Sequence, residues 1–321
     1  MNKVLYYPYI NLPKVDWTLR TLLYYETVSS IVPHEYFDFP KKNYEPFMLE
    51  LVQSELVIPI DPYDVLDKFS EISKTFLEFL SGKDYQFKKK AKEFETKKFS
   101  GARIHSEKFD HELYYQLEQR KLAKKGDGMW FIVEDSTANY LMKFLSSVIS
   151  GKLNLQPITD RYTSISSKVE KKRDIKREII LNDLIPCPQD INIKKLKKFK
   201  DKYPGLLNSF KNRIEGLVFD DSIKEESQLF KIRIEELKIR KDELHAKMGE
   251  SQFKNILFGS VCGVVGTIPG IITANTAVTV IGGLSSFASA VYTALKIEKP
   301  EKIFDQSGMK YLALVEKRLL K

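Results

Sequence analysis

The chain has 321 residues, of which 43% are hydrophobic and 12% aromatic, so it can bury a substantial core, and global disorder is not expected. Its formal charge of +9 favours contact with an anionic partner, either nucleic acid or a phospholipid surface, although the basic residues are spread along the chain. The two cysteines, Cys187 and Cys262, match no metal-binding or redox spacing, so we expect reduced, buried thiols.

The first elements alternate between strand and helix signals. MNKVLYYPYINLPK has no long apolar run and no small-residue cleavage site, so we expect no secretory signal and a cytoplasmic protein. Residues 4–10 predict a strand, and residues 17–28 predict a helix with Asp16 as its N-cap. A second strand is predicted over 56–60, followed by an amphipathic helix over 63–80.

The middle of the chain continues the alternation. Residues 83–100 are basic with interleaved phenylalanines and predict a helix or a long loop. A helix is predicted over 107–124, a glycine turn over 126–128, and the strongest strand of the sequence over 129–133. Residues 137–149 return to helical spacing.

The pattern then becomes mostly helical. Residues 178–185 predict a strand, and residues 193–217 predict an amphipathic helical stretch with a kink or a junction at Pro204-Gly205. Residues 1–218 therefore predict one helix-rich mixed domain of the α+β or α/β class, with a sensing or regulatory role.

A segment of different character follows over residues 219–252. Ser222 and Glu225 match a capping box, and the helix behind them is highly charged. Its apolar residues keep heptad spacing: Phe230, Ile234, Leu237, Leu244 and Met248. This helix is either a stalk or one arm of a coiled coil, and four heptads favour an intramolecular partner over a dimer seam.

Residues 253–297 are apolar and carry no charged residue between Lys254 and Lys296. Two helices of about 20 residues each would match a hydrocarbon core of about 30 Å. Small residues allow close helix packing in lipid, and we expect this packing, or that of an oligomer, to use Gly259, Gly263, Gly266, Pro269, Gly270, Gly282 and Gly283. The alternative is a buried soluble hairpin, because the second segment is rich in Ser and Thr and Pro269-Gly270 can end the first helix early.

Basic residues flank this predicted hairpin on both sides. They are Lys254, Lys296, Lys299 and Lys302, while the connection between the two helices carries no charge. Both ends of the hairpin would then face the cytoplasm. Residues 298–321 predict a basic C-terminal helix.

No enzymatic motif or cofactor motif stands out elsewhere. The glycines lack a phosphate-loop arrangement. His105 and His111, with Glu107, Asp110 and Glu112, form no metal-ligand spacing and are interpreted as a solvated helix face, and His34 is interpreted as structural.

Two acidic sites near strand ends stay open as a candidate enzyme site. Glu134 follows the strongest strand, but an N-cap by Asp135 or Ser136 explains the local sequence equally well. Thr159-Asp160-Arg161 is either a polar site or a turn with an internal ion pair.

Several short motifs resemble those of a bacterial family of unknown function. They are Leu-Tyr-Tyr-Pro-Tyr-Ile at 5–10, Trp17, Leu-Leu-Tyr-Tyr at 22–25, Ser-Ile-Val-Pro at 30–33, Ala-Asn-Tyr-Leu-Met at 138–142, Thr-Asp at 159–160, Leu-Ile-Pro-Cys-Pro at 184–188, Phe-Lys-Asp-Lys-Tyr at 199–203 and Phe-Lys-Asn-Arg at 210–213. The resemblance covers residues 3–218 and implies a bacterial origin but no catalytic residues. It does not extend to the apolar segment.

The predicted function is a bacterial effector that associates with or perturbs the inner membrane, permanently or conditionally, in a phage-defence or stress system. Its expected partners are the lipid bilayer and further copies of the chain. The alternative is a soluble adaptor that binds nucleic acid or protein, with the apolar hairpin as core. The basic stretches at 88–98, 168–177 and 194–202 would then contact the nucleic acid.

Overall fold

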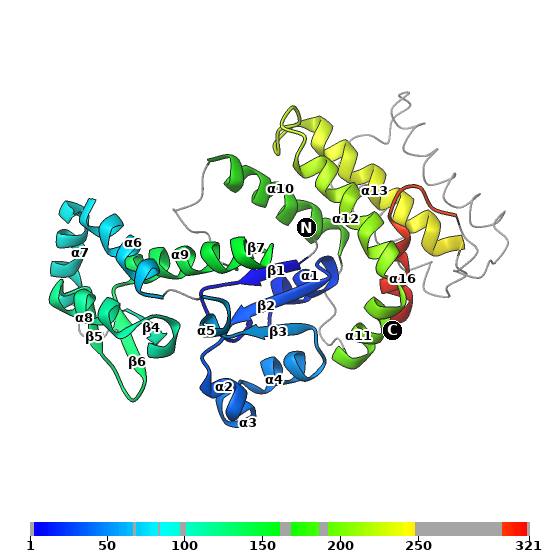
Figure 1. Cartoon of the computed structure of the whole chain (residues 1–321). Helices are drawn as coiled ribbons and strands as arrows, with labels where there is room; N and C mark the ends of the chain where they lie inside the picture. The colour runs from blue at the N-terminus through cyan, green and yellow to red at the C-terminus, as the bar shows by residue number, and fades with distance from the viewer. Residues whose placement is uncertain are drawn as a thin grey trace. The chain divides into compact units, whose positions relative to one another are not determined.

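The computed structural model describes residues 3–66, 69–82, 84–96, 101–160, 168–185, 192–247 and 304–319. The chain divides into two compact units, Met1–Ser166 and Ser167–Lys321 (Figure 1). The described residues are helix-rich and include one small parallel and one small antiparallel sheet, so the predicted mixed α+β class is confirmed. The predicted hairpin at 253–297 lies outside the described residues.

The first unit is built on a parallel sheet with the strand order β3-β2-β1-β7. Its strands are β1 (Lys3–Tyr6), β2 (Thr27–Ile31), β3 (Val57–Ile60) and β7 (Gln156–Ile158). The central pairing places Leu5 opposite Ser29 on one side and Pro157 on the other. Val4, Leu5 and Tyr6 are completely buried, as expected for a strand that is covered on both faces.

The predicted helix over 17–28 is too long, because its last residues form β2. The helix α1 (Asp16–Tyr24) ends at Tyr24, and Tyr25 adopts an extended backbone. Hydrogen bonding to β1 and β3 supplies the partners that make 27–31 a strand, and a local pattern does not show them. The N-cap of α1 is Val15, so the predicted cap at Asp16 is wrong.

Short helices connect the first three strands to the rest of the unit. They are α2 (Glu35–Asp38), α3 (Pro40–Asn43), α4 (Pro46–Gln53) and α5 (Pro62–Val65). The predicted strand at 56–60 is confirmed as β3. The predicted helix at 63–80 is divided into α5 and α6 (Phe69–Gly82).

Between β3 and β7 the chain adds a helical layer and a small antiparallel sheet. The helices are α6, α7 (Asp84–Thr96), α8 (His111–Gln119) and α9 (Asp135–Leu153), and the 3-10 helix η1 covers Ser106–Lys108. The sheet has the order β4-β6-β5, from β4 (Ala102–His105), β5 (Ala123–Lys125) and β6 (Trp130–Val133). The predicted helix at 107–124 is therefore shorter, whereas the turn at 126–128 and the strand at 129–133 are confirmed.

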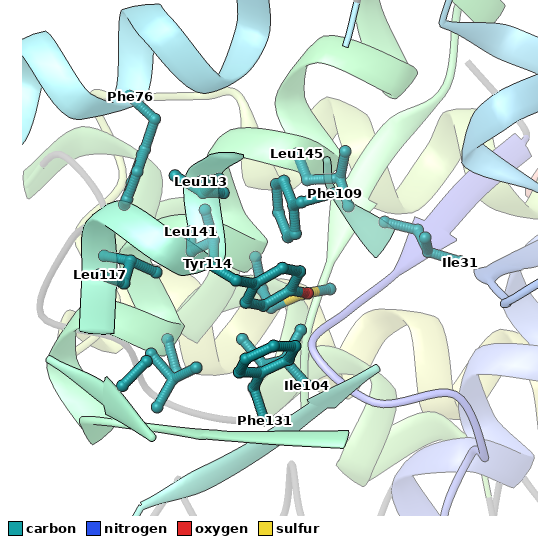
Figure 2. Packing of buried hydrophobic residues seen from close by; sticks show 14 of the residues in the cluster. Ile31, Phe76, Ile104, Phe109, Leu113, Tyr114, Leu117, Phe131, Leu141 and Leu145 are labelled. Carbon is teal, nitrogen blue, oxygen red and sulfur yellow. The ribbon is translucent and has the colours of Figure 1, made fainter. Parts of the chain in front are cut away.

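One apolar core joins the parallel sheet to this added layer. Figure 2 shows Tyr114 and Phe131 stacked face to face, with ring centroids 4.1 Å apart. Ile31 from the parallel sheet and Leu145 from α9 belong to the same buried cluster. The added layer is therefore an integral part of the first unit.

The regular elements described in the second unit are all helices. Its helices are α10 (Lys168–Leu184), α11 (Ile193–Lys202), α12 (Pro204–Val218), α13 (Gln228–Lys247) and α16 (Lys310–Leu319). The predicted strand at 178–185 is wrong: Ile180, Leu181 and Leu184 recur at helical spacing and are buried in a unit where α10 packs on α12 and α13. Pro204 begins α12 and separates it from α11, so of the two predicted alternatives, a kink or a junction, the junction is confirmed.

The charged helix α13 has an intramolecular partner, as predicted. Phe230, Ile234 and Leu237 are buried, and α13 packs on α16 and α10. The helix begins later than the capping box predicts, because Ser222 bonds to Asp220 in a turn. The predicted domain boundary near residue 218 falls between two helices of the same unit.

Candidate functional site

None of the residues predicted to pack or flank the apolar hairpin lies in the described part of the chain. They are Gly259, Gly263, Gly266, Pro269, Gly270, Gly282, Gly283, Lys254, Lys296, Lys299 and Lys302. Among the helices that are described, none is long and apolar enough to span a membrane. The geometry of a site therefore has to come from other residues.

A histidine and an aspartate meet where β2 and β3 end. These strands are parallel neighbours, so their carboxyl ends lie at the same edge of the sheet. His34 follows β2 and Asp61 directly follows β3, and Nδ1 of His34 lies 2.8 Å from Oδ2 of Asp61. Oδ1 of Asp61 accepts the backbone N–H of Tyr63 at 2.9 Å, so Asp61 caps α5 while it orients the imidazole. Ligand sites in parallel sheets characteristically form at this edge.

The two partners differ sharply in exposure. The side chain of His34 is 64% exposed and that of Asp61 is 2% exposed. The hydrogen bond that His34 donates to Asp61 is the main reason that the pKa of His34 is raised, and the charges of Asp61, Asp38 and Glu107 raise it further. A buried carboxylate thus holds an imidazole that faces solvent.

A second histidine lies inside the protein. His105 at the end of β4 is completely buried, and its Nδ1 accepts the backbone N–H of Glu107 at 3.3 Å. Its Nε2 lies 3.4 Å from Oε1 of Glu35 without hydrogen-bonding geometry. Burial lowers the pKa of His105 although Glu35 and Glu107 oppose this, so we treat the imidazole as neutral.

Glu107 links the two histidines. Its Oε2 accepts the backbone N–H of Glu35 at 3.3 Å, directly after His34, and its charge raises the pKa of His34. The side chain of Glu107 therefore connects η1 to the start of α2. This contact brings His34, Asp61, Glu35, His105 and Glu107 into one cluster, which we call the carboxyl-edge cluster.

The predicted solvated helix face at 105–112 is only partly correct. His111 and Glu112 lie on the exposed first turn of α8, and Oδ1 of Asp110 caps this helix by accepting the N–H of Leu113 at 2.9 Å. His105, in contrast, is buried in the carboxyl-edge cluster. In the described ranges, no group of three or more His, Cys, Asp or Glu residues is arranged to hold a metal ion.

The other acidic candidates have separate roles. Oδ1 of Asp160 accepts a hydrogen bond from the hydroxyl of Tyr6 at 3.1 Å, and Arg161, its predicted ion-pair partner, lies outside the described residues. Glu134 is the N-cap of α9, one residue before the predicted caps Asp135 and Ser136. Glu134 is therefore structural, and Asp160 lies at the far side of β1 from the carboxyl-edge cluster.

In the second unit, a buried ion pair joins the helices on either side of the apolar segment. Nζ of Lys241 on α13 lies 2.6 Å from Oε1 of Glu316 on α16, and both side chains are buried. Arg240 also approaches Asp305, with Nε 3.9 Å from Oδ1. These two contacts therefore join the described residues on either side of the apolar segment.

Sequence reasoning missed the pairing of His34 with Asp61. Each residue follows an apolar run and adjoins a proline, which is a signal for a strand end. The signal was hidden at His34 because residues 17–28 predicted a helix, so β2 and its carboxyl end were not expected. Without β2, nothing placed His34 beside Asp61.

Comparison with known proteins adds no assignment. No family model matches the chain, and neither the curated proteins nor the solved structures contain a match. The resemblance of residues 3–218 to a family of unknown function therefore stays a prediction.

Proposed function

We propose that the protein is a bacterial membrane-associated or membrane-perturbing effector, as in a phage-defence or stress system, with the first unit as its cytosolic regulatory part. The observation that carries this proposal is the absence of charged residues over 255–295, between two helices that pack on each other. The expected location is the cytoplasmic face of the inner membrane, and the expected partners are lipid and further copies of the chain.

The packing of α13 on α16 supports the proposal. The ion pair between Lys241 and Glu316 fixes both helices at a buried position. The helices before and after the apolar segment are therefore packed on each other. A transfer of the segment from water to lipid would not require these two helices to unfold.

The residue types of the segment also support a lipid environment. Gly259 and Gly263 form one small-xxx-small pair and Gly266 and Gly270 form another, the pattern that allows close helix contact in lipid. Lysines precede and follow the segment, as the positive-inside rule requires for a hairpin with cytoplasmic ends.

The test compares the full chain with a variant in which a Gly-Ser linker replaces residues 253–297. The linker variant keeps both α13 and α16, the helices before and after the segment. We expect the full chain to float with anionic phospholipid vesicles and to need detergent for release, while the linker variant stays soluble. If the full chain remains soluble with the vesicles, as the linker variant does, the proposal is wrong.

A single substitution tests the role of the glycines. Gly263→Leu is expected to weaken membrane association or toxicity, because a large side chain separates closely packed helices. Gly216→Leu is the matched control, because a side chain added at Gly216 on α12 meets nothing within 4 Å. Equal behaviour of the two variants would contradict the packing proposal.

A soluble nucleic-acid adaptor remains the second candidate, and one observation favours it. The helix α11 buries Ile193, Leu196 and Phe199, while Lys194, Lys195 and Lys198 are exposed. Such a basic face can contact phosphates. Retention on DNA or RNA that falls steeply with salt, in both the full chain and the linker variant, would favour the adaptor over the effector.

A further inference from the structure

The carboxyl-edge cluster has a geometry that the proposed membrane role does not use. A buried carboxylate holds one nitrogen of an exposed imidazole, and carboxylates from α2 and η1 lie close to the same ring. We propose that His34 is the general base of a hydrolytic site that acts on neutral or cationic acyl compounds, namely esters or amides.

The bond to Asp61 determines which nitrogen of His34 can react. Nδ1 donates to Oδ2 of Asp61 at 2.8 Å, so the neutral imidazole carries its proton on Nδ1. Nε2 is then the basic nitrogen, and no described residue provides it with a partner. Because the side chain is 64% exposed, a water molecule and a substrate can reach Nε2 together.

The reaction needs only water as a second reactant. Nε2 of His34 takes a proton from water while the water oxygen forms a bond to the acyl carbon. The imidazolium then returns this proton to the leaving oxygen or nitrogen as the acyl bond breaks. His34 ends the cycle neutral, and the products are a carboxylic acid and an alcohol or amine.

Asp61 acts as a positioning residue in this step. Its side chain is 2% exposed and is held by the N–H of Tyr63, so its orientation is fixed before substrate arrives. A carboxylate in this position keeps the correct tautomer of the imidazole and stabilises the imidazolium that forms.

The charge around His34 selects the substrate class. The carboxylates of Asp61, Asp38 and Glu107 lie close enough to raise the pKa of His34. The same negative field repels a phosphodiester and attracts an ammonium group. This local field is opposite in sign to the net charge of +9 of the whole chain.

Exposed aromatic rings strengthen the preference for a cation. The ring of Phe37 stacks on that of His34 with centroids 6.4 Å apart and is 41% exposed. Tyr63, two residues after Asp61, is 50% exposed. Burial raises the pKa of Tyr63, and the charges of Asp110, Glu107 and Asp61 raise it further. Aromatic faces beside carboxylates bind quaternary ammonium groups.

The test uses the full chain and three probes of different charge. These are acetylcholine, which is cationic, p-nitrophenyl acetate, which is neutral, and bis(p-nitrophenyl) phosphate, which is anionic. We expect the acceleration over the uncatalysed rate to be largest for acetylcholine and to shrink with added salt, and we expect kcat/KM to fall about 100-fold in His34→Gln. His111→Gln is the matched control, because His111 is an exposed histidine outside the cluster.

The pH profile tests the role of Asp61. Activity requires neutral His34, so it falls as pH decreases through the pKa of His34, which Asp61, Asp38 and Glu107 raise. In Asp61→Asn the pKa falls, and we expect this limb of the profile to move to lower pH as well as the rate to drop. A change in rate with an unmoved limb would overturn the positioning role.

Two outcomes would overturn the hydrolytic site itself. One is that the wild type and His34→Gln hydrolyse every probe at the same rate, while circular dichroism shows that both proteins are folded. The other is faster cleavage of the phosphodiester than of the acyl probes. Membrane association is measured separately by flotation, so its failure would leave this result unaffected.

Discussion

The two units differ in where they bury charged side chains. In the first unit the described buried charges lie at the ends of elements: Asp61 after β3, Lys108 at the end of η1 and Glu134 before α9. In the second unit, buried charged residues lie along its helices, namely Lys176, Arg177, Lys200, Lys211, Lys241, Lys310 and Glu316. The described interior of the first unit is therefore an apolar core with charged residues only at the ends of its elements, whereas the interior of the second unit has charged residues along its helices.

The difference follows from the residues each unit has available. The first unit packs a sheet against helices, so it can concentrate aromatic and aliphatic side chains in one cluster. The helices of the second unit are rich in lysine, and long side chains cover apolar surface with their methylene stems. Their charged ends then require partners, as in the two hydrogen bonds from Arg177 to Glu215, each 2.9 Å.

The largest expected effect comes from removing one partner of a buried pair in the second unit. Lys241→Met leaves Glu316 buried without its cation, which costs about 3–5 kcal/mol. Both tryptophans of the chain, Trp17 and Trp130, lie in the first unit. We therefore expect the unfolding transition followed by circular dichroism to move to lower urea concentration. The transition followed by tryptophan fluorescence should not move.

Two further variants check this interpretation. Replacing both partners, in Lys241→Met with Glu316→Leu, is expected to recover most of the lost stability, because no unpaired charge remains. Lys231→Met on the exposed face of α13 is expected to change little. If the double variant is no more stable than the single one, the loss has a packing origin instead.

The corresponding change in the first unit removes apolar volume. Leu145 on α9 is completely buried in the core cluster, so Leu145→Ala is expected to cost about 3 kcal/mol and to shift the tryptophan transition. Leu153→Ala on the same helix is the control, because Leu153 is 42% exposed. Equal effects of the two substitutions would contradict the assignment of this core.

The sequence predicts what depends on local pattern. The strand β6, the turn before it and the helix α9 were expected within a few residues, because alternation and spacing are properties of neighbours in sequence. The strand β2 was not expected, because its stability depends on pairing with β1 and β3, which are distant in sequence.

The candidate site illustrates the same limit. His34 and Asp61 are 27 residues apart, and only the parallel pairing of β2 with β3 brings them together. His105 was expected to be solvated, yet it is buried, since the fold covers it between Trp130 and Glu35. Tertiary packing determines these environments, and a single sequence does not record them.

A partly buried acid beside the ion pair gives a smaller, pH-dependent prediction. Nζ of Lys241 lies 2.6 Å from Glu316 but 3.9 Å from Oδ1 of Asp242, so the lysine mainly neutralises Glu316. Burial raises the pKa of Asp242 from 3.8 to about 6, despite the opposing charge of Lys241. Between these values the folded state binds more protons than the unfolded state, so stability falls as pH rises.

Asp242→Asn removes this dependence. We expect it to stabilise the second unit by up to about 3 kcal/mol at neutral pH and by little at about pH 4. Circular dichroism during urea unfolding at both pH values measures the difference. Glu236→Gln, at an exposed position on α13, provides the control, and a gain that is independent of pH would contradict the titration of Asp242.

The smallest expected effect is at Glu134, a buried charge at the end of an element. Its carboxylate accepts hydrogen bonds from the N–H and hydroxyl groups of Ser136 and Thr137, at 2.7–3.0 Å. Burial alone would raise the pKa of Glu134, but these bonds outweigh it and lower the pKa below 4.5. The carboxylate therefore stabilises the fold above that pH and loses its effect as pH falls through the lowered pKa.

Glu134→Gln is expected to cost about 1 kcal/mol at neutral pH, because the amide keeps one acceptor oxygen but loses the charge. The cost should shrink at low pH, where the wild-type carboxylate is protonated as well. Tryptophan fluorescence during urea unfolding measures both values, with the exposed Glu50→Gln as control. A cost that is the same at all pH values would show that the charge of Glu134 does not contribute to stability. The buried charge at this element end would then be no more important for stability than a neutral polar group.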